Sequence, residues 1–302
     1  MSKKTSFIRT TESVTSLRLD FIIAILPSII WSFIRFGVSA FITVVTSVVT
    51  ACIADVLINF LLKSKLKAPS LYSAYYGIIF GAILYDETDI LLTALGSLLT
   101  VLLIYILGGV GKSFVFAPVA ARLLIFNFLP YRVNKPADLP IEILYNGELP
   151  GETLYDLVLG MSKGAIGTVS VLAILWAFVY LWIRKSGDLK SSLSYIAALC
   201  ILFFAFPAFQ GRGVESAAFE LFSGEILFAA AFILPDYGSS PNSTLLKYIA
   251  GIVCGLLTFT FRKVGYVADS VFFSILCTNM VVYVTSTISN HIKEVKYEKQ
   301  SS

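Results

Sequence analysis

The sequence predicts an all-α polytopic membrane protein with about ten transmembrane helices. Two observations favour this fold class. Hydrophobic residues make up 57% of the 302 residues and charged residues only 14%, with a mean hydropathy of +0.83, whereas soluble domains average about 45–50% apolar and about 25% charged residues. The apolar residues also form runs long enough to cross a bilayer, separated by short polar turns. A soluble core is therefore excluded.

Each expected span is an apolar run bounded by turn residues or charges. In chain order, the expected spans are residues 20–36, 38–62, 70–85, 89–108, 114–130, 163–183, 191–208, 217–234, 244–261 and 268–289. The polar start runs directly into the first span without a small-residue cleavage site, so we expect this span to remain as an anchor.

Lysine and arginine gather in alternate turns, which sets the orientation because short cytoplasmic loops collect these residues. With both termini inside, the following basic residues all lie in the cytoplasm: Lys3, Lys4, Arg9, Arg18, Lys63, Lys65, Lys67, Lys112, Arg184, Lys185, Lys190, Lys293, Lys296 and Lys299. Arg262 and Lys263 are exceptions. We therefore expect a multi-pass protein of the cytoplasmic membrane, with a cytoplasmic arm over residues 1–19, an extracytoplasmic loop over 131–162 and a cytoplasmic tail over 291–302.

The net charge and the positions of the cysteines indicate which partners and metal sites are not expected. The net charge of +4 comes without a basic patch that interleaves aromatic residues, so no nucleic-acid partner is expected. Cys52, Cys200, Cys254 and Cys277 fall inside apolar runs without ligand spacing. We interpret them as packing residues and expect no metal site made by this chain alone.

A faint internal repeat divides the spans into two inverted five-helix repeats, residues 20–130 and 163–290. The run FGAILYD in the first half corresponds to LFAAAFILPD in the second, and a Val-Gly pair then precedes a helix that ends in Asn127 or Asn279. Chance similarity between apolar helices is the alternative.

Small residues form one face of the third span. Ser73, Gly77 and Gly81 recur every four residues, which places them on the same side of a helix. Such a face usually allows two helices to pack closely in lipid. The functional alternative is that it admits a flat ring or an ion path near the backbone.

Ionisable residues inside the spans are candidates for an ion path, because each costs about 2.5–3.5 kcal/mol at the centre of the membrane and usually faces a partner or a wet cavity. Asp55 is the preferred candidate, with Asn59 one turn later on the same helix face. Further ionisable residues in or at the spans are Arg122, Glu220, Glu225 and Asp269. Structural pairing is the alternative for them, especially for Glu220 and Asp269.

The outer loop contains Pro150-Gly151-Glu152-Thr153-Leu154-Tyr155-Asp156. From the residues alone, this is a turn followed by a helix, with Thr153 as the N-cap and Asp156 as its capping-box partner.

The order of several motifs resembles the RnfD/NqrB family, whose members are membrane subunits of the Rnf ion-translocating oxidoreductase and of the sodium-pumping NADH:quinone reductase. The resemblance starts at TSFIRTTESVTSLRLDFIIAILPSIIW, continues through SAYYGIIFGAILY, LGGVGKSFVFAPVAARLL, GMSKGAIGTVSVLAILW and LFAAAFILPDYGSSP, and ends at RKVGYVADSVFFSILCTN. It covers essentially the whole chain, and the short polar start favours the Rnf type.

The resemblance implies a membrane flavoprotein subunit of an Rnf-type electron-transfer complex that translocates Na⁺ or H⁺. It implies ten helices in two inverted halves and FMN attached through its phosphate to a threonine on the outer face by a flavin transferase. Thr153 is the matching threonine, after Gly151. The partners would be the other subunits of the complex, and the chain would not be active alone.

The chain departs from the family pattern at two flavin sites. Pro150 and Glu152 replace the small residues of the usual attachment pattern, and GGVGKSFVFAPVA lacks both asparagines found in relatives near a second flavin. We therefore expect the second flavin to be absent or weakly bound. The alternative function is a flavin-free ion carrier or structural subunit that retained the fold.

Overall fold

The structure is a computed structural model that describes residues 14–63, 70–109, 113–137, 139–148, 150–208, 213–238, 240–241, 243–265 and 267–301. These residues are helical with connecting turns and contain no β-strand, which confirms the all-α prediction. The helices are α1 (Val14–Phe36), α2 (Val38–Lys63), α3 (Leu71–Ala82), α4 (Ile90–Ile106), α5 (Ala117–Phe128), η1 (Pro130–Arg132), α6 (Pro140–Tyr145), α7 (Leu154–Leu159), α8 (Val171–Arg184), α9 (Lys190–Ala205), α10 (Gly213–Phe222), α11 (Ile226–Phe228), the π-helical η2 (Ala229–Ile233), α12 (Thr244–Val264) and α13 (Ser270–Ser301).

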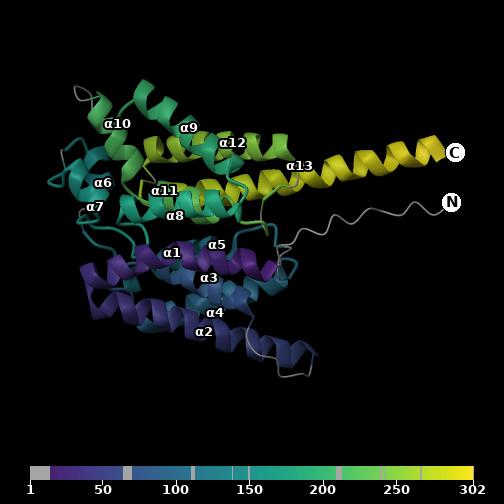
Figure 1. The fold of residues 1–302 in the computed structure, drawn as a ribbon, viewed down its shortest axis with the longest axis horizontal. Coiled ribbons are helices and arrows are strands. Elements are labelled where there is room, and N and C mark those ends of the chain that lie inside the picture. The colour runs from purple at the N-terminus through teal and green to yellow at the C-terminus, as the bar shows by residue number, and fades with distance from the viewer. Residues whose placement is uncertain are drawn as a thin grey trace.

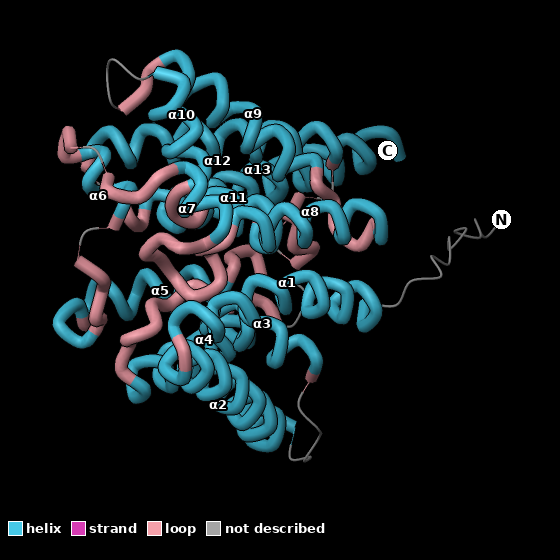
Figure 2. Tube along the Cα trace, turned by 60° about the vertical axis from the view of Figure 1, so that its left-hand side comes forward, coloured by secondary structure: helices cyan, strands magenta, loops and turns pink. Residues whose placement is uncertain are grey.

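The helices form two groups that lie side by side (Figure 1). One group contains α1 to α5 and the other α8 to α13, and the turned view in Figure 2 keeps them apart. One large apolar core joins the groups, with Ile25 and Tyr75 from the first and Phe228 and Phe272 from the second. The short helices α6 and α7 lie at the left-hand end in Figure 1, opposite the end of α13.

The chain is a multi-pass membrane protein. By length and composition, three described helices can cross a membrane: Thr15–Phe36, Val38–Leu62 and Thr244–Val264. A fourth candidate is α10 together with α11 and η2, which bends by 55° at its break. Several shorter apolar helices pack beside them. Large apolar side chains such as Ile34, Leu61 and Trp182 lie on the outer surface, where lipid would cover them.

Local chemistry explains most helix boundaries. Gly37 separates α1 from α2 with a φ of +73°, a left-handed conformation that glycine adopts without strain. Ser70, Asp89 and Ser170 cap the starts of α3, α4 and α8 with side-chain oxygens that accept backbone N–H bonds. Gly265, in the left-handed region, ends α12.

Two expected spans are shortened or broken in the structure. The span expected at 163–183 becomes helical only at Val171, because the preceding backbone pairs with the end of α3: the Ile166 N–H donates to Leu84 O at 2.8 Å and the Gly167 N–H to Ala82 O at 2.6 Å. The span expected at 217–234 is broken between α10 and α11, where Gly224 has a φ of +74°.

The last helix is longer than expected. The expected span ends at residue 289, whereas α13 continues through the predicted tail to Ser301. The tail sequence HIKEVKYEKQ is rich in lysine and glutamate, which are good helix formers, so the helix does not need an apolar surface to continue.

Candidate functional site

Thr153 lies at an exposed N-cap. Its hydroxyl donates to Asp156 Oδ2 at 2.8 Å and accepts the Asp156 N–H at 3.3 Å, and its own backbone N–H donates to the same carboxylate at 2.7 Å. This is the capping box that the sequence predicted. The hydrogen bonds from Thr153 lower the pKa of Asp156, so this carboxylate stays ionised and keeps accepting the threonine proton.

The surroundings of Thr153 leave room for an attached group. Thr153 is exposed, and a Cβ placed on Gly151 would meet no atom within 4 Å. The following helix is anchored at Leu157, which is buried, and at Gly160, whose left-handed backbone fits against Trp31 and Ser170. A rigid short helix therefore presents a hydroxyl to the medium at the α6–α7 end of the molecule (Figure 1).

Asp55 is the centre of a buried polar network near the other end. It is 1% exposed. Its Oδ1 accepts from the Tyr105 hydroxyl at 2.6 Å and from Asn59 Nδ2 at 3.0 Å, whereas its Oδ2 accepts the Ser70 N–H at 2.7 Å and lies 3.2 Å from Ser73 Oγ. Neutral donors alone thus satisfy this carboxylate within the described residues, and the predicted Asp55–Asn59 pair is present.

Asp55 and Thr153 do not form one site. Arg18, at the start of α1, lies over the ring of Tyr72, beside the Ser70 cap that contacts Asp55. Arg35, near the end of α1, donates to Met161 O just after α7. These two ends of α1 are about 25 Å apart at 1.5 Å per residue. Asp55 and Thr153 therefore lie toward opposite ends of α1.

The small-residue face of α3 packs against α2. A Cβ on Gly77 would lie 2.9 Å from Val48 Cα, and one on Gly81 would lie 3.0 Å from Val44 Cα. Ser47 Oγ also donates to Gly77 O at 2.6 Å. The close-packing interpretation therefore accounts for Gly77 and Gly81, and a flat ring has no room there. Ser73, on the same face, contributes to the Asp55 network instead.

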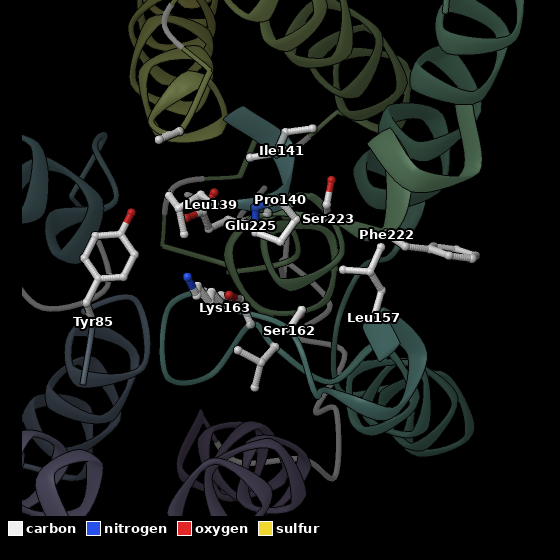
Figure 3. A pocket seen from close by; sticks show the side chains of 15 residues that line it. Tyr85, Leu139, Pro140, Ile141, Leu157, Ser162, Lys163, Phe222, Ser223 and Glu225 are labelled. Atoms are coloured by element: carbon white, nitrogen blue, oxygen red, sulfur yellow. The ribbon is translucent and has the colours of Figure 1, made fainter. Parts of the chain in front are cut away.

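Arg122 on α5 of the first group meets Glu225 and Asp269 of the second group at the interface between the two groups. Arg122 is fully buried; its NH1 group donates to Asp269 Oδ1 at 2.7 Å, and its NH2 group lies 3.8 Å from Glu225 Oε1. Beside them is a small cavity of about 20 Å³, which Figure 3 shows between Leu139 and Pro140 at the start of α6, Ser162 and Lys163, and Ser223 and Glu225.

Arg262, an exception to the charge rule, has a structural explanation. It is 1% exposed, and its guanidinium donates to Glu220 O at 2.7 Å and to Ser223 O at 3.3 Å. It therefore caps the broken end of α10 and carries no information about which loop is cytoplasmic.

One buried cluster was not predicted. Arg18 lies 3.5 Å above the Tyr72 ring, with NH1 3.8 Å from Asp236 Oδ1, and the Tyr76 hydroxyl donates to Asp236 Oδ2 at 3.1 Å. The cluster joins the two helix groups at the end that contains Ser70. Arg18 and Asp236 are far apart in the sequence, so no spacing pattern links them. The only sign of the cluster in the sequence is that its residues lie at the ends of apolar runs.

Comparisons with known proteins all point to the same family. The model of the NQR2, RnfD, RnfE family matches residues 1–296. The chain is 27% identical over 304 residues to the D subunit of the Na(+)-translocating ferredoxin:NAD(+) oxidoreductase complex of Acetobacterium woodii, covering 96% of this chain and 92% of that relative. Shorter similarities are to the D subunits of the ion-translocating oxidoreductase complexes of Colwellia psychrerythraea, 30% identical over 118 residues, and Stutzerimonas stutzeri, 33% identical over 128 residues. These cover 36% and 41% of this chain and 33% and 35% of those relatives.

Proposed function

Because the chain belongs to the NQR2, RnfD, RnfE family, we propose that it is the membrane flavoprotein subunit of an Rnf-type electron-transfer complex that translocates Na⁺ or H⁺. Its partners are the other subunits of that complex, and it is not active alone. The observation that supports the flavin part of the proposal is the exposed Thr153, whose hydroxyl is hydrogen-bonded to Asp156.

The residues around Thr153 fit a phosphodiester of FMN. Thr153 Oγ1 would carry the phosphate, Gly151 leaves the approach open, and Asp156 orients the Thr153 hydroxyl by accepting its hydrogen bond. When bound, FMN supplies one- and two-electron chemistry, and the protein holds and orients it. Asp156 also disfavours attachment of FMN, because its negative charge repels the phosphate. A flavin transferase must overcome this repulsion.

We propose ten membrane passes in two inverted halves, with α6, α7 and Thr153 outside and both termini in the cytoplasm. The packing supports this: α2 contacts α3 and α4 in the first group, and α9 contacts α10 and α12 at the corresponding positions of the second. Counting α10, α11 and η2 as one broken span gives the same number of helices in each group. The Asp55 network, near the cytoplasmic end, is the proposed entry to the ion path.

The alternative is a flavin-free carrier or structural subunit. The capping box favours it, because Thr153 already has a complete structural role at the start of α7.

Thr153 variants separate the two functions. In cells that co-express a flavin transferase active on a control substrate, we expect the wild-type chain to give a band that fluoresces in a denaturing gel and a peptide with the mass of added FMN. Thr153→Ser keeps a hydroxyl and should retain part of the label, whereas Thr153→Val keeps the shape and should abolish it.

Both variants should still insert into the membrane, since losing an N-cap costs only about 0.5–2 kcal/mol. An unmodified mass for the wild-type peptide under these conditions would decide for the cofactor-free alternative.

A further inference from the structure

Two buried glutamates flank the break after α10, and their surroundings differ. Glu220 is 0% exposed, and both of its oxygens have donors: the Tyr145 hydroxyl at 2.5 Å from Oε2 and the Ala208 N–H at 2.7 Å from Oε1. Both oxygens of this buried carboxylate therefore have a hydrogen-bond donor.

Glu225 lacks such donors. It is 5% exposed, and no other described residue donates a hydrogen bond to its carboxylate. Arg122 NH2, at 3.8 Å, is beyond hydrogen-bond distance, because the guanidinium is directed to Asp269 at 2.7 Å. The buried Arg122 thus faces two carboxylates and donates to Asp269, whose side chain is 28% exposed. An ionised Glu225 would be a buried negative charge without a hydrogen-bonded cation, which is costly away from water.

The other charged and titratable groups around Glu225 do not supply this missing partner. These groups are Tyr85 after α3, Arg122 on α5, Lys163 before α8, Tyr195 on α9, Arg262 on α12 and Asp269 before α13. The Tyr195 hydroxyl is paired with Thr258 Oγ1 at 3.3 Å. Arg262 donates to the carbonyls of Glu220 and Ser223, and Lys163 donates to Ala137 O at 3.3 Å. Tyr85 lies 3.5 Å from Arg122 NH2 and can accept from it.

A cavity connects Glu225 with the surface. Its volume of about 20 Å³ is enough for about one water molecule. Ser162, Thr168 and Ser223 provide hydroxyl groups in its lining, and Ser223 Oγ is buried without a hydrogen-bond partner among the described residues. Lys163, which is exposed, also lines it, so the cavity reaches the α6–α7 end (Figure 3).

We propose that Glu225 is a proton-binding site that exchanges protons with the α6–α7 end of the molecule through this cavity. The carboxylate takes a proton from hydronium through the cavity water, so that one O–H bond forms at Glu225, and the proton leaves by the reverse step. Protonation removes this buried charge and leaves Arg122 paired with Asp269 alone. The inference goes beyond the proposed function and does not depend on flavin at Thr153.

Infrared titration of the purified chain tests the proposal. As the pH rises, the wild-type chain should lose the C=O absorption of a protonated carboxylic acid. Glu225→Gln should lack this titrating band while keeping the wild-type elution volume and helix content. Glu220→Gln serves as the matched control: it removes a buried glutamate from the same broken span, and it should keep the band.

A second measurement addresses the site directly. Dicyclohexylcarbodiimide, an apolar reagent, attacks protonated carboxylic acids within membranes, and peptide fragmentation can assign the adduct. We expect the adduct on Glu225 and not on Glu220 of the same chain, and less of it at higher pH. The proposal is wrong if Glu225→Gln retains the titrating band, or if the wild-type chain has neither such a band nor an adduct at Glu225.

Discussion

At the scale of single residues, the carboxylates of the two proposed sites differ in burial and in hydrogen-bond donors. Asp156 lies at the surface and accepts hydrogen bonds from the backbone N–H and the hydroxyl of Thr153. Asp55 is buried and accepts from four neutral donors, an arrangement that stabilises a negative charge without a fixed cation. A mobile cation near Asp55 would therefore be attracted by this unpaired negative charge.

The role of Asp55 can be tested against a matched variant. Asp55→Asn removes the charge and leaves at least one donor facing an amide N–H, which costs about 1–3 kcal/mol. Tyr105→Phe removes one donor, costs a similar amount of stability and keeps the charge. If Asp55 lies on the ion path, ion-coupled turnover of the assembled complex should fall much more in Asp55→Asn than in Tyr105→Phe. Equal turnover in the two variants, at equal protein content, would make Asp55 structural.

At the scale of the elements, the α2–α3 contact allows a test of the glycine face. Gly77→Ala would put a methyl group 2.9 Å from the Val48 backbone, so it should destabilise the chain by about 1–3 kcal/mol. Gly151→Ala, in open space, should change stability by less than about 0.5 kcal/mol. Thermal unfolding in detergent measures both. Loss of bound flavin from Gly77→Ala without loss of stability would favour a cofactor site on α3.

The junction between α4 and α5 should bind no stoichiometric second flavin. Ser113 Oγ is already used, since it donates to Val115 O at 2.6 Å, and Phe116 and Ala117 are fully buried and apolar. The site therefore offers few free donors or acceptors to an isoalloxazine ring. Extraction of the purified chain with denaturant should release no stoichiometric non-covalent flavin; one equivalent would contradict this expectation.

The sequence predicted most elements, because apolar runs and turn residues mark helix ends. It missed the break between α10 and α11, since Ser223 and Gly224 hardly change the hydropathy of the run. It also missed the irregular segment before α8, which looks like part of an apolar span but in which Ile166 and Gly167 donate to backbone carbonyls at the end of α3. For the site, the capping box and the Asp55–Asn59 pair were predictable from spacing, whereas Ser70 and Tyr105 come from other elements and left no signal in the sequence.

At the scale of the whole molecule, orientation in the membrane is the property to test. In a background without the four native cysteines, a cysteine at Asn146 should react with an impermeant reagent added outside, because it follows α6 at the proposed outer end. A cysteine at Ser64, which follows α2 and lies outside the described residues, should react only after the membrane is opened. The reverse pattern would invert the topology.

The break between α10 and α11 also affects how the chain enters the membrane. The carbonyls of Glu220 and Ser223 find their donor in Arg262, which lies 42 and 39 residues later in the chain. Until α12 has been synthesised, the end of α10 would expose bare carbonyls to lipid, at a cost of several kcal/mol for each group. We therefore expect nascent chains truncated before Arg262 to keep α10 beside the insertion machinery, and the complete chain to release both helices together.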